Sequence, residues 1–178
     1  MSASPVSTPP FQFAWHVPDL ETAASYWADQ LGVGPFFVSD VDAAERDGFA
    51  YRGGAGELTM RVGWAESPQG QIELIQVTSS APNVYHDLIA PDRTAFHHVG
   101  VWSDDYAADR ARLSERYEVA MDLGVGTNIC YFDTSADSGT MLELIERTDT
   151  IVGLFGMIRQ ACDAWDGTRP VREMAELF

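Results

Sequence analysis

The sequence has 178 residues, of which 46% are hydrophobic and 21% are charged, which fits one globular domain or two small fused modules and argues against disorder along the whole chain. Its 11 basic and 27 acidic side chains give a net charge of −16. This acidity argues against nucleic acids and anionic membrane surfaces as partners.

Two cysteines without a CxxC motif do not form a secreted disulfide scaffold. The first ten residues lack the basic and apolar regions of a signal peptide. The apolar stretch at 151–158 is far shorter than the roughly 20 residues of a membrane helix. We therefore expect a cytoplasmic protein with no membrane segment.

In chain order, a Ser-, Pro- and Thr-rich start precedes a pattern that occurs twice. Each copy begins with a polar residue, continues with strand-forming residues and reaches an Asp seven positions later. The pairs are Gln12 with Asp19 and His98 with Asp105. Asp is a favoured helix N-cap, so each Asp predicts the start of a helix.

Helical spacing follows both Asp residues, although it is weaker in the second copy. In the first copy the apolar residues run from Leu20 to Leu31, and Gly32 is placed to end the helix. Strands are predicted next, at 35–38, 49–52, 58–64 and 71–77 in the first half and at 119–121, 128–132 and 140–145 in the second. Each half therefore has the pattern of a βαβββ module.

Apolar spacing from Ile151 to Trp165 predicts a C-terminal helix, and residues 83–90 are predicted to form a short linker helix. We divide the chain into a flexible N-terminus (1–10), a first βαβββ module (11–80), a linker (81–94), a second βαβββ module (95–147) and a C-terminal helical extension (148–178).

Four polar residues occupy equivalent places in the two copies. They are Gln12 and His98 at the starts of strands, and Glu73 and Glu143 within otherwise apolar strands. A buried carboxylate needs a cation, an Arg partner or solvent, and either Glu taken alone could face water on a one-sided sheet. The repetition in both copies favours a metal ion, because one imidazole, two carboxylates and an amide oxygen suit a divalent cation.

These residues and their surroundings resemble the vicinal oxygen chelate superfamily over about residues 10–147. This superfamily includes glyoxalase I, methylmalonyl-CoA epimerase, extradiol dioxygenases and bleomycin-resistance proteins. The motifs that carry the resemblance are Val-Pro-Asp-Leu-Glu at 17–21, Leu-Gly-Val-Gly-Pro-Phe at 31–36, Ile-Glu-Leu-Ile-Gln at 72–76, Phe-His-His-Val-Gly-Val at 96–101 and Met-Leu-Glu-Leu-Ile-Glu at 141–146.

The resemblance implies an α+β fold in which two tandem βαβββ modules form an open, eight-stranded cupped barrel, here with an added C-terminal helix. It also implies that Gln12, Glu73, His98 and Glu143 bind a divalent metal ion such as Zn, Ni, Co or Mn. His97 stands seven residues before Asp104, so its register also fits. The repeat alignment and strand alternation favour His98 as the residue that faces the barrel.

The ligand pattern is similar to those of glyoxalase I and methylmalonyl-CoA epimerase. It implies a metal-dependent isomerase, epimerase or lyase that removes a proton next to a metal-chelated carbonyl. Glu143 is the first candidate for the base and Glu73 the second. With few basic residues to attract glutathione or coenzyme A, a small hydrophobic substrate fits better.

Two alternatives remain at this point: a non-catalytic, resistance-type protein that binds a small molecule, and an iron-dependent dioxygenase, which a single candidate His disfavours. The family resemblance also implies a homodimer. Whether the site lies within one chain or is shared between two chains stays open.

Overall fold

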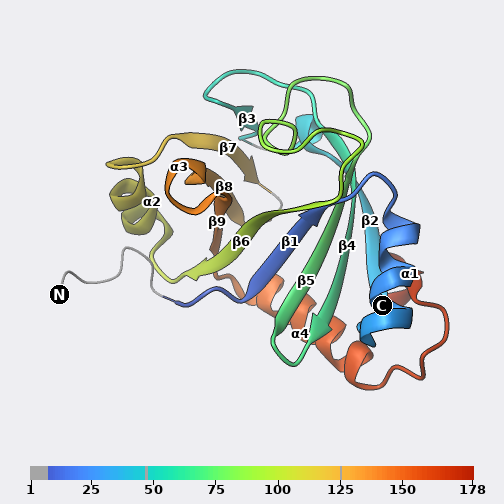
Figure 1. Ribbon diagram of the computed structural model, residues 1–178. Coiled ribbons are helices and arrows are strands. Elements are labelled where there is room, and N and C mark those ends of the chain that lie inside the picture. The colour runs from blue at the N-terminus through green and yellow to red at the C-terminus, as the bar shows by residue number, and fades with distance from the viewer. Residues whose placement is uncertain (1–7, 47, 125) are drawn as a thin grey trace.

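The computed structural model describes residues 8–46, 48–124 and 126–178. Within them, two halves share a strand, a helix and three further strands, to which the first half adds a short 3-10 helix and a short strand and the second half adds a short helix (Figure 1). The first half contains β1 (Gln12–His16), α1 (Leu20–Leu31), β2 (Phe36–Asp42), η1 (Ala43–Glu45), β3 (Ala50–Tyr51), β4 (Thr59–Ser67) and β5 (Gly70–Val77). The second half contains β6 (Ala95–Ser103), α2 (Tyr106–Ser114), β7 (Val119–Gly124), β8 (Asn128–Asp133), α3 (Ser135–Ser138) and β9 (Met141–Glu146). The C-terminal part contains α4 (Asp149–Asp163), β10 (Val171–Glu173) and η2 (Met174–Leu177).

All described strands belong to one curved, unclosed sheet in the order β10-β2-β4-β5-β1-β6-β9-β8-β7-β3. The first strands of the two halves, β1 and β6, are antiparallel neighbours at its centre, and each pairs in parallel with the last strand of its own half. The eight strands of the cup are confirmed. The strand predicted at 49–52 is the short β3 at one end of the sheet, and β10 extends the other end. The α+β cupped fold is therefore confirmed.

The caps predicted from sequence are present at both helices. The Asp19 carboxylate accepts a hydrogen bond from the Thr22 amide at the start of α1, and the Asp105 carboxylate accepts one from Ala108 at the start of α2. Gly32 ends α1 with φ of 67°, a left-handed conformation that costs glycine little.

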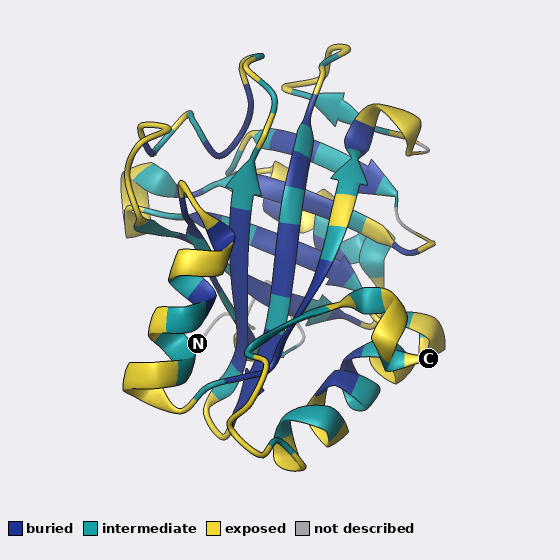
Figure 2. Cartoon of the chain, turned by 90° about the vertical axis from the view of Figure 1, so that its right-hand side faces the viewer, coloured by how far each residue is buried: buried dark blue, intermediate teal, exposed yellow. Residues whose placement is uncertain are grey.

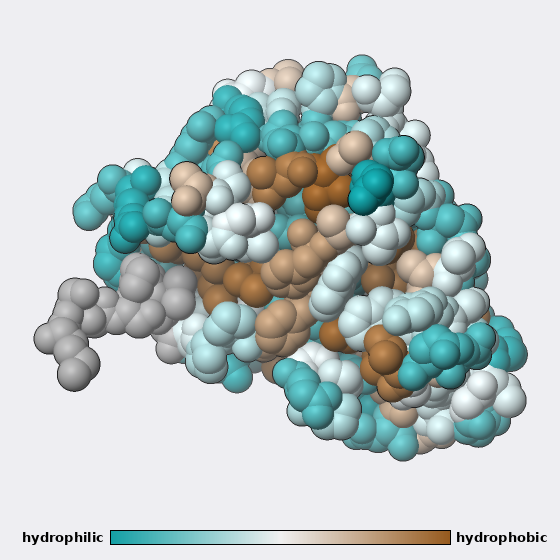
Figure 3. All heavy atoms as spheres, in the orientation of Figure 1, coloured by the Kyte–Doolittle hydropathy of each residue, from teal (hydrophilic) through white to brown (hydrophobic). Residues whose placement is uncertain are grey.

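The core lies on both faces of the sheet. On the outer face, Leu20 and Ala24 of α1 pack in a cluster with residues of β2, β4 and β5. On the inner face, side chains of the two halves pack against each other inside the cup. Figure 2 shows that the strands are mostly buried and that the helices are exposed along one side. Hydrophobic side chains gather in the middle of the face drawn in Figure 3, with hydrophilic ones around them.

Two local predictions are wrong or incomplete. The linker helix predicted at 83–90 is replaced by turns at 84–88, although the Asn83 side chain accepts hydrogen bonds from the amides of Tyr85 and His86 as a helix N-cap does. The segment cannot extend further, because Pro91 disfavours helical backbone in the residue before it. The short strand β3 pairs with β7 of the other half rather than with its own. In the C-terminal part, the predicted helix is confirmed as α4, while β10, which pairs with β2, was not foreseen. No helix within the described ranges is long and apolar enough to span a membrane.

Candidate metal centre

The strand register brings the four predicted ligand residues to one place on the inner face of the sheet. They are Gln12 of β1, Glu73 of β5, His98 of β6 and Glu143 of β9. Ala14 pairs with Glu73 on one side and with His98 on the other. Gly100 pairs with Gln12 and with Glu143. The two halves thus contribute one strand-start residue and one Glu each, on four adjacent strands.

The polar groups of this cluster are close together and almost fully buried. Nε2 of His98 lies 3.2 Å from Oε2 of Glu73 and 3.2 Å from Oε2 of Glu143. One ligand atom from each of these three residues lies within 4.8 Å of the others. The exposed fractions are 0% for His98, 6% for Glu73 and 4% for Glu143. Such a set of nitrogen and oxygen donors suits a divalent cation.

Each of the four residues has one buried polar atom that makes no hydrogen bond in the described part of the chain, although those of Glu73, His98 and Glu143 form the 3.2 Å ion-pair contacts given above. These atoms are Oε1 of Gln12, Oε2 of Glu73, Nε2 of His98 and Oε2 of Glu143. Buried polar atoms normally make hydrogen bonds. Four such atoms without one, gathered in one place, are explained by a site for a bound ion. Among the described residues, the remaining atom of this kind is Nε2 of His86, which belongs to the linker.

Gly100, which has no side chain, lies next to two of these atoms. A Cβ placed on this glycine would lie 2.5 Å from Oε1 of Gln12 and 3.2 Å from Oε2 of Glu143. The first distance is shorter than real contacts of a Cβ allow. The glycine therefore keeps open the region toward which the amide and carboxylate oxygens point.

Without a bound cation, the imidazole compensates for the two carboxylates. Burial alone would lower the pKa of His98, but Glu143 and Glu73 outweigh it and raise this pKa to about 9. Burial, together with the nearby charge of Glu143, raises the pKa of Glu73. An imidazolium thus neutralises part of the buried negative charge at neutral pH, and a metal ion that binds Nε2 would replace its proton.

His97 fixes the orientation of the His98 ring. Nε2 of His97 lies 3.1 Å from the carbonyl oxygen of Val84, and its Nδ1 lies 2.9 Å from Nδ1 of His98. Burial lowers the pKa of His97 well below its usual value, so this ring is neutral. Because a carbonyl only accepts, Nε2 of His97 carries the hydrogen, and its Nδ1 accepts from Nδ1–H of His98. Nε2 of His98 therefore faces the cluster, as strand alternation indicates.

The two glutamates are held differently. The indole Nε1–H of Trp64 donates a hydrogen bond of 2.7 Å to Oε1 of Glu73. No comparable donor reaches the Glu143 carboxylate within the described ranges apart from the nearby His98. The Glu73 carboxylate is therefore more firmly oriented than that of Glu143.

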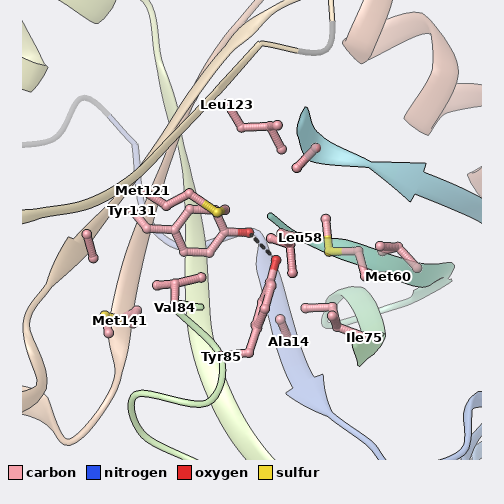
Figure 4. Packing of buried hydrophobic residues seen from close by; sticks show 13 residues of the cluster. Ala14, Leu58, Met60, Ile75, Val84, Tyr85, Met121, Leu123, Tyr131 and Met141 are labelled. Atoms are coloured by element: carbon pink, nitrogen blue, oxygen red, sulfur yellow. Dashed lines mark hydrogen bonds between the residues drawn. The ribbon is translucent and has the colours of Figure 1, made fainter. Parts of the chain in front are cut away.

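The cluster lies at one wall of a cavity of about 290 Å³, near the lower end of the size range of small-molecule sites. Its walls are mostly apolar and include side chains of α4. Within the described residues, the cation that lines it is Arg46. Two buried tyrosines, Tyr85 and Tyr131, also line it, and their hydroxyls meet 3.4 Å apart inside the cup (Figure 4).

Comparison with known protein families agrees with this geometry. Residues 11–132 match the model of the glyoxalase/bleomycin resistance protein/dioxygenase superfamily. The chain belongs to this superfamily. It is the vicinal oxygen chelate superfamily that the sequence motifs indicated. A comparison with curated protein sequences finds no significant match.

Several solved structures share the fold at low sequence identity. Methylmalonyl-CoA epimerase from Mycobacterium tuberculosis is 17% identical with a TM-score of 0.57, and the match covers 86% of this chain and 97% of that one. A hypothetical protein from Bacillus halodurans is 12% identical with a TM-score of 0.57, covering 80% and 96%. A variant of Streptomyces coelicolor methylmalonyl-CoA epimerase in complex with 2-nitronate-propionyl-CoA is 15% identical with a TM-score of 0.54, covering 80% and 96%.

Several residues around the cluster were not identified from sequence. Gly100 could have been found from the repeat, because both copies have a small residue two positions after the proposed ligand. These residues are Ala14 after Gln12 and Gly100 after His98. Trp64 lies in the strand predicted at 58–64, but nothing in the sequence marks its contact with Glu73. Glu66 and Arg159 gave no signal, since their contacts join segments far apart in the chain.

Proposed function

We propose that this protein is a metal-dependent isomerase, epimerase or lyase that moves a proton next to a carbonyl group of a small, largely hydrophobic substrate. Gln12, Glu73, His98 and Glu143 would hold the metal ion, with Zn, Ni, Co and Mn as candidates. The observation that carries the proposal is the convergence of four buried polar atoms, one from each residue, that make no hydrogen bond within the described ranges and lie beside a cavity.

The donor set fits a divalent ion in number and in type. When bound, the ion would supply positive charge to the substrate's oxygens and stabilise negative charge that develops there. The neighbouring groups already hold the donors in orientation, with His97 behind His98 and Trp64 beside Glu73. Such supporting hydrogen bonds are typical of metal sites.

The difference between the two carboxylates supports Glu143 as the base that accepts the proton. A base must move between bound and proton-accepting positions, and Glu143 lines the cavity with only the His98 ring close to its carboxylate among the described donors. Glu73 also lines the cavity, but the Trp64 hydrogen bond restrains its carboxylate. Glu73 therefore remains the second candidate.

The cavity walls support a substrate with an apolar body. Among the lining side chains, those of Val62, Leu123, Ile129, Leu154 and Phe155 offer no hydrogen bonds. Burial raises the pKa of Tyr85 and of Tyr131 well above that of free tyrosine, so both hydroxyls are protonated and can donate to a substrate oxygen.

One His in the cluster argues against the dioxygenase alternative, whose iron sites use two His and one carboxylate. The binding-protein alternative shares the apolar cavity but does not require a base. We keep the homodimer as an expectation based on the family resemblance, and light scattering coupled to size-exclusion chromatography tests it.

The first experiment measures metal binding by the untagged, full-length chain. Metal-free protein is reconstituted separately with Zn, Ni, Co and Mn, dialysed and analysed by mass spectrometry. We expect close to one ion per chain for at least one metal and loss of that ion in Glu143→Ala. Glu146→Ala is the matched control, because Glu146 lies on the opposite face of β9.

The second experiment tests for catalysis without knowledge of the substrate. Loaded protein is incubated in D2O with small hydrophobic carbonyl compounds that carry two neighbouring oxygens, and deuterium uptake at the adjacent carbon is followed by NMR. Uptake that requires Glu143 supports the enzyme. No metal in the wild type after reconstitution would refute the metal centre, and metal without uptake would favour the binding protein.

A further inference from the structure

A chain of buried hydrogen bonds connects the cluster to the C-terminal helix. Nε2 of Gln12 donates to Oε1 of Gln71 at 2.7 Å, and Nε2 of Gln71 donates to Oε1 of Glu66 at 2.9 Å. The other oxygen of Glu66 pairs with the Arg159 guanidinium on α4. The exposed fractions of Gln12, Gln71 and Glu66 are 1%, 0% and 8%, so water does not compete for the two bonds that the amides make. The Arg159 side chain is half exposed.

The direction of every bond in this chain follows from one group. An ionised carboxylate only accepts hydrogen bonds, so Glu66 must receive N–H groups from both Arg159 and Gln71. Gln71 then has its amide oxygen toward Gln12. Gln12 in turn must present its NH2 group to Gln71, which leaves its own oxygen, Oε1, directed toward the cluster.

This direction matters because the two ends of an amide differ in chemistry. The oxygen of Gln12 can bind a cation, whereas its NH2 group cannot. The oxygen and the NH2 group of an amide have almost the same shape, so exchanging their positions changes mainly the hydrogen bonds. A neighbouring group of fixed hydrogen-bond direction is therefore needed to select one of the two positions. The side chain alone would therefore not determine which end faces a metal ion.

We infer that Gln71, Glu66 and Arg159 are positioning residues that direct the Gln12 amide oxygen toward the metal ion. This inference rests on the proposed metal centre and extends it to α4, which also lines the cavity. The Arg159–Glu66 contact joins residues 93 positions apart in the chain, so the docking of α4 on the sheet supplies the cationic end of the relay.

The test uses Glu66→Gln, because an amide at this position can donate as well as accept and no longer fixes the direction. Co(II) is titrated into metal-free protein, and its dissociation constant is measured by visible absorption. We expect binding about 10- to 100-fold weaker than in the wild type, the usual effect of losing a supporting hydrogen bond at a metal site. Glu176→Gln is the control, because its exposed pair with Arg169 lies in the same C-terminal part.

A double-mutant cycle separates positioning from a general loss of structure. In a Gln12→Met background the relay has no amide to direct, so Glu66→Gln should not weaken Co(II) binding further. If the two losses of affinity add, the relay does not act through Gln12 and the inference is wrong. Should Glu66→Gln fail to fold, Arg159→Gln takes its place in the cycle, with a smaller loss in the same direction.

A metal-free readout keeps the inference distinct from the proposed function. In the wild type, the Gln12 side-chain NH2 protons should exchange slowly with D2O by NMR, and Glu66→Gln should speed this exchange. If the wild type binds no metal, the proposed function fails, and this exchange alone decides the relay. If the wild type binds Co(II) but Glu66→Gln changes neither affinity nor exchange, the relay is refuted and the metal centre stands.

Discussion

Replacing Glu143 by Gln should stabilise the metal-free protein while it weakens metal binding. The cluster buries two carboxylates and one imidazolium, so one negative charge remains uncompensated without a cation. The amide of Gln is nearly isosteric with the carboxylate and removes that charge. The expected result is a variant whose stability relative to the wild type changes sign with the metal.

The magnitude follows from the distances in the cluster. At an effective dielectric constant of about 20, Glu143 attracts the His98 imidazolium 3.2 Å away by about 5 kcal/mol. Its repulsion by Glu73, whose oxygen lies within 4.8 Å, is about 3 kcal/mol or more. Burying the carboxylate itself costs several kcal/mol, so the three contributions leave a gain of about 2 kcal/mol when Glu143 is neutralised.

The assay is thermal unfolding at pH 7.0 in EDTA and again in excess Co(II). For a chain of this size, about 2 kcal/mol raises the melting temperature of Glu143→Gln by about 4–8 °C in EDTA. Co(II) at about 100 times its dissociation constant should stabilise the wild type by about 2.7 kcal/mol and the variant much less. Glu146→Gln should change little in either buffer. A variant less stable than the wild type in EDTA would refute this reasoning.

Three further predictions concern neighbours of the cluster. Gly100→Ala should weaken Co(II) binding at least tenfold, because the new Cβ occupies space next to Oε1 of Gln12; unchanged affinity would contradict the assigned space. Trp64→Phe removes the hydrogen bond to Glu73 and should lower the unfolding free energy by about 1–3 kcal/mol in urea titrations, and an unchanged midpoint would contradict that bond. The pKa of His98, raised to about 9 from 6.5, contributes stability that is complete below pH 6.5 and lost as the pH rises through 9. The unfolding free energy of the metal-free protein should therefore fall by about 1–3 kcal/mol between pH 7.0 and 9.5, and a flat profile would show that His98 is not an imidazolium.

The repeat in the sequence predicted most of the fold because its signals are local. Asp19 and Asp105 act within three residues of themselves, so their caps form wherever the helix goes. Strand alternation places each Glu on one face of its strand and turns His98 toward the barrel, and in the structure His98 lies 3.2 Å from both glutamates. The predicted linker helix does not form although Asn83 binds the amides of Tyr85 and His86 as an N-cap does, because only a few residues separate this cap from Pro91, which disfavours helical backbone at Ala90.

The sequence by itself determined the family, the two βαβββ patterns and the four residues proposed as ligands, since each depends on residue types at short spacings within one copy. The division into modules and the ligand roles stay predictions. Only the tertiary structure decided that the four donor atoms meet, because this depends on the register of β5, β1, β6 and β9. The tertiary structure also brings Gly100 next to the Gln12 oxygen and connects Arg159 to Gln12 through hydrogen bonds. Residues separated by tens of positions come together only when the sheet and the helix pack.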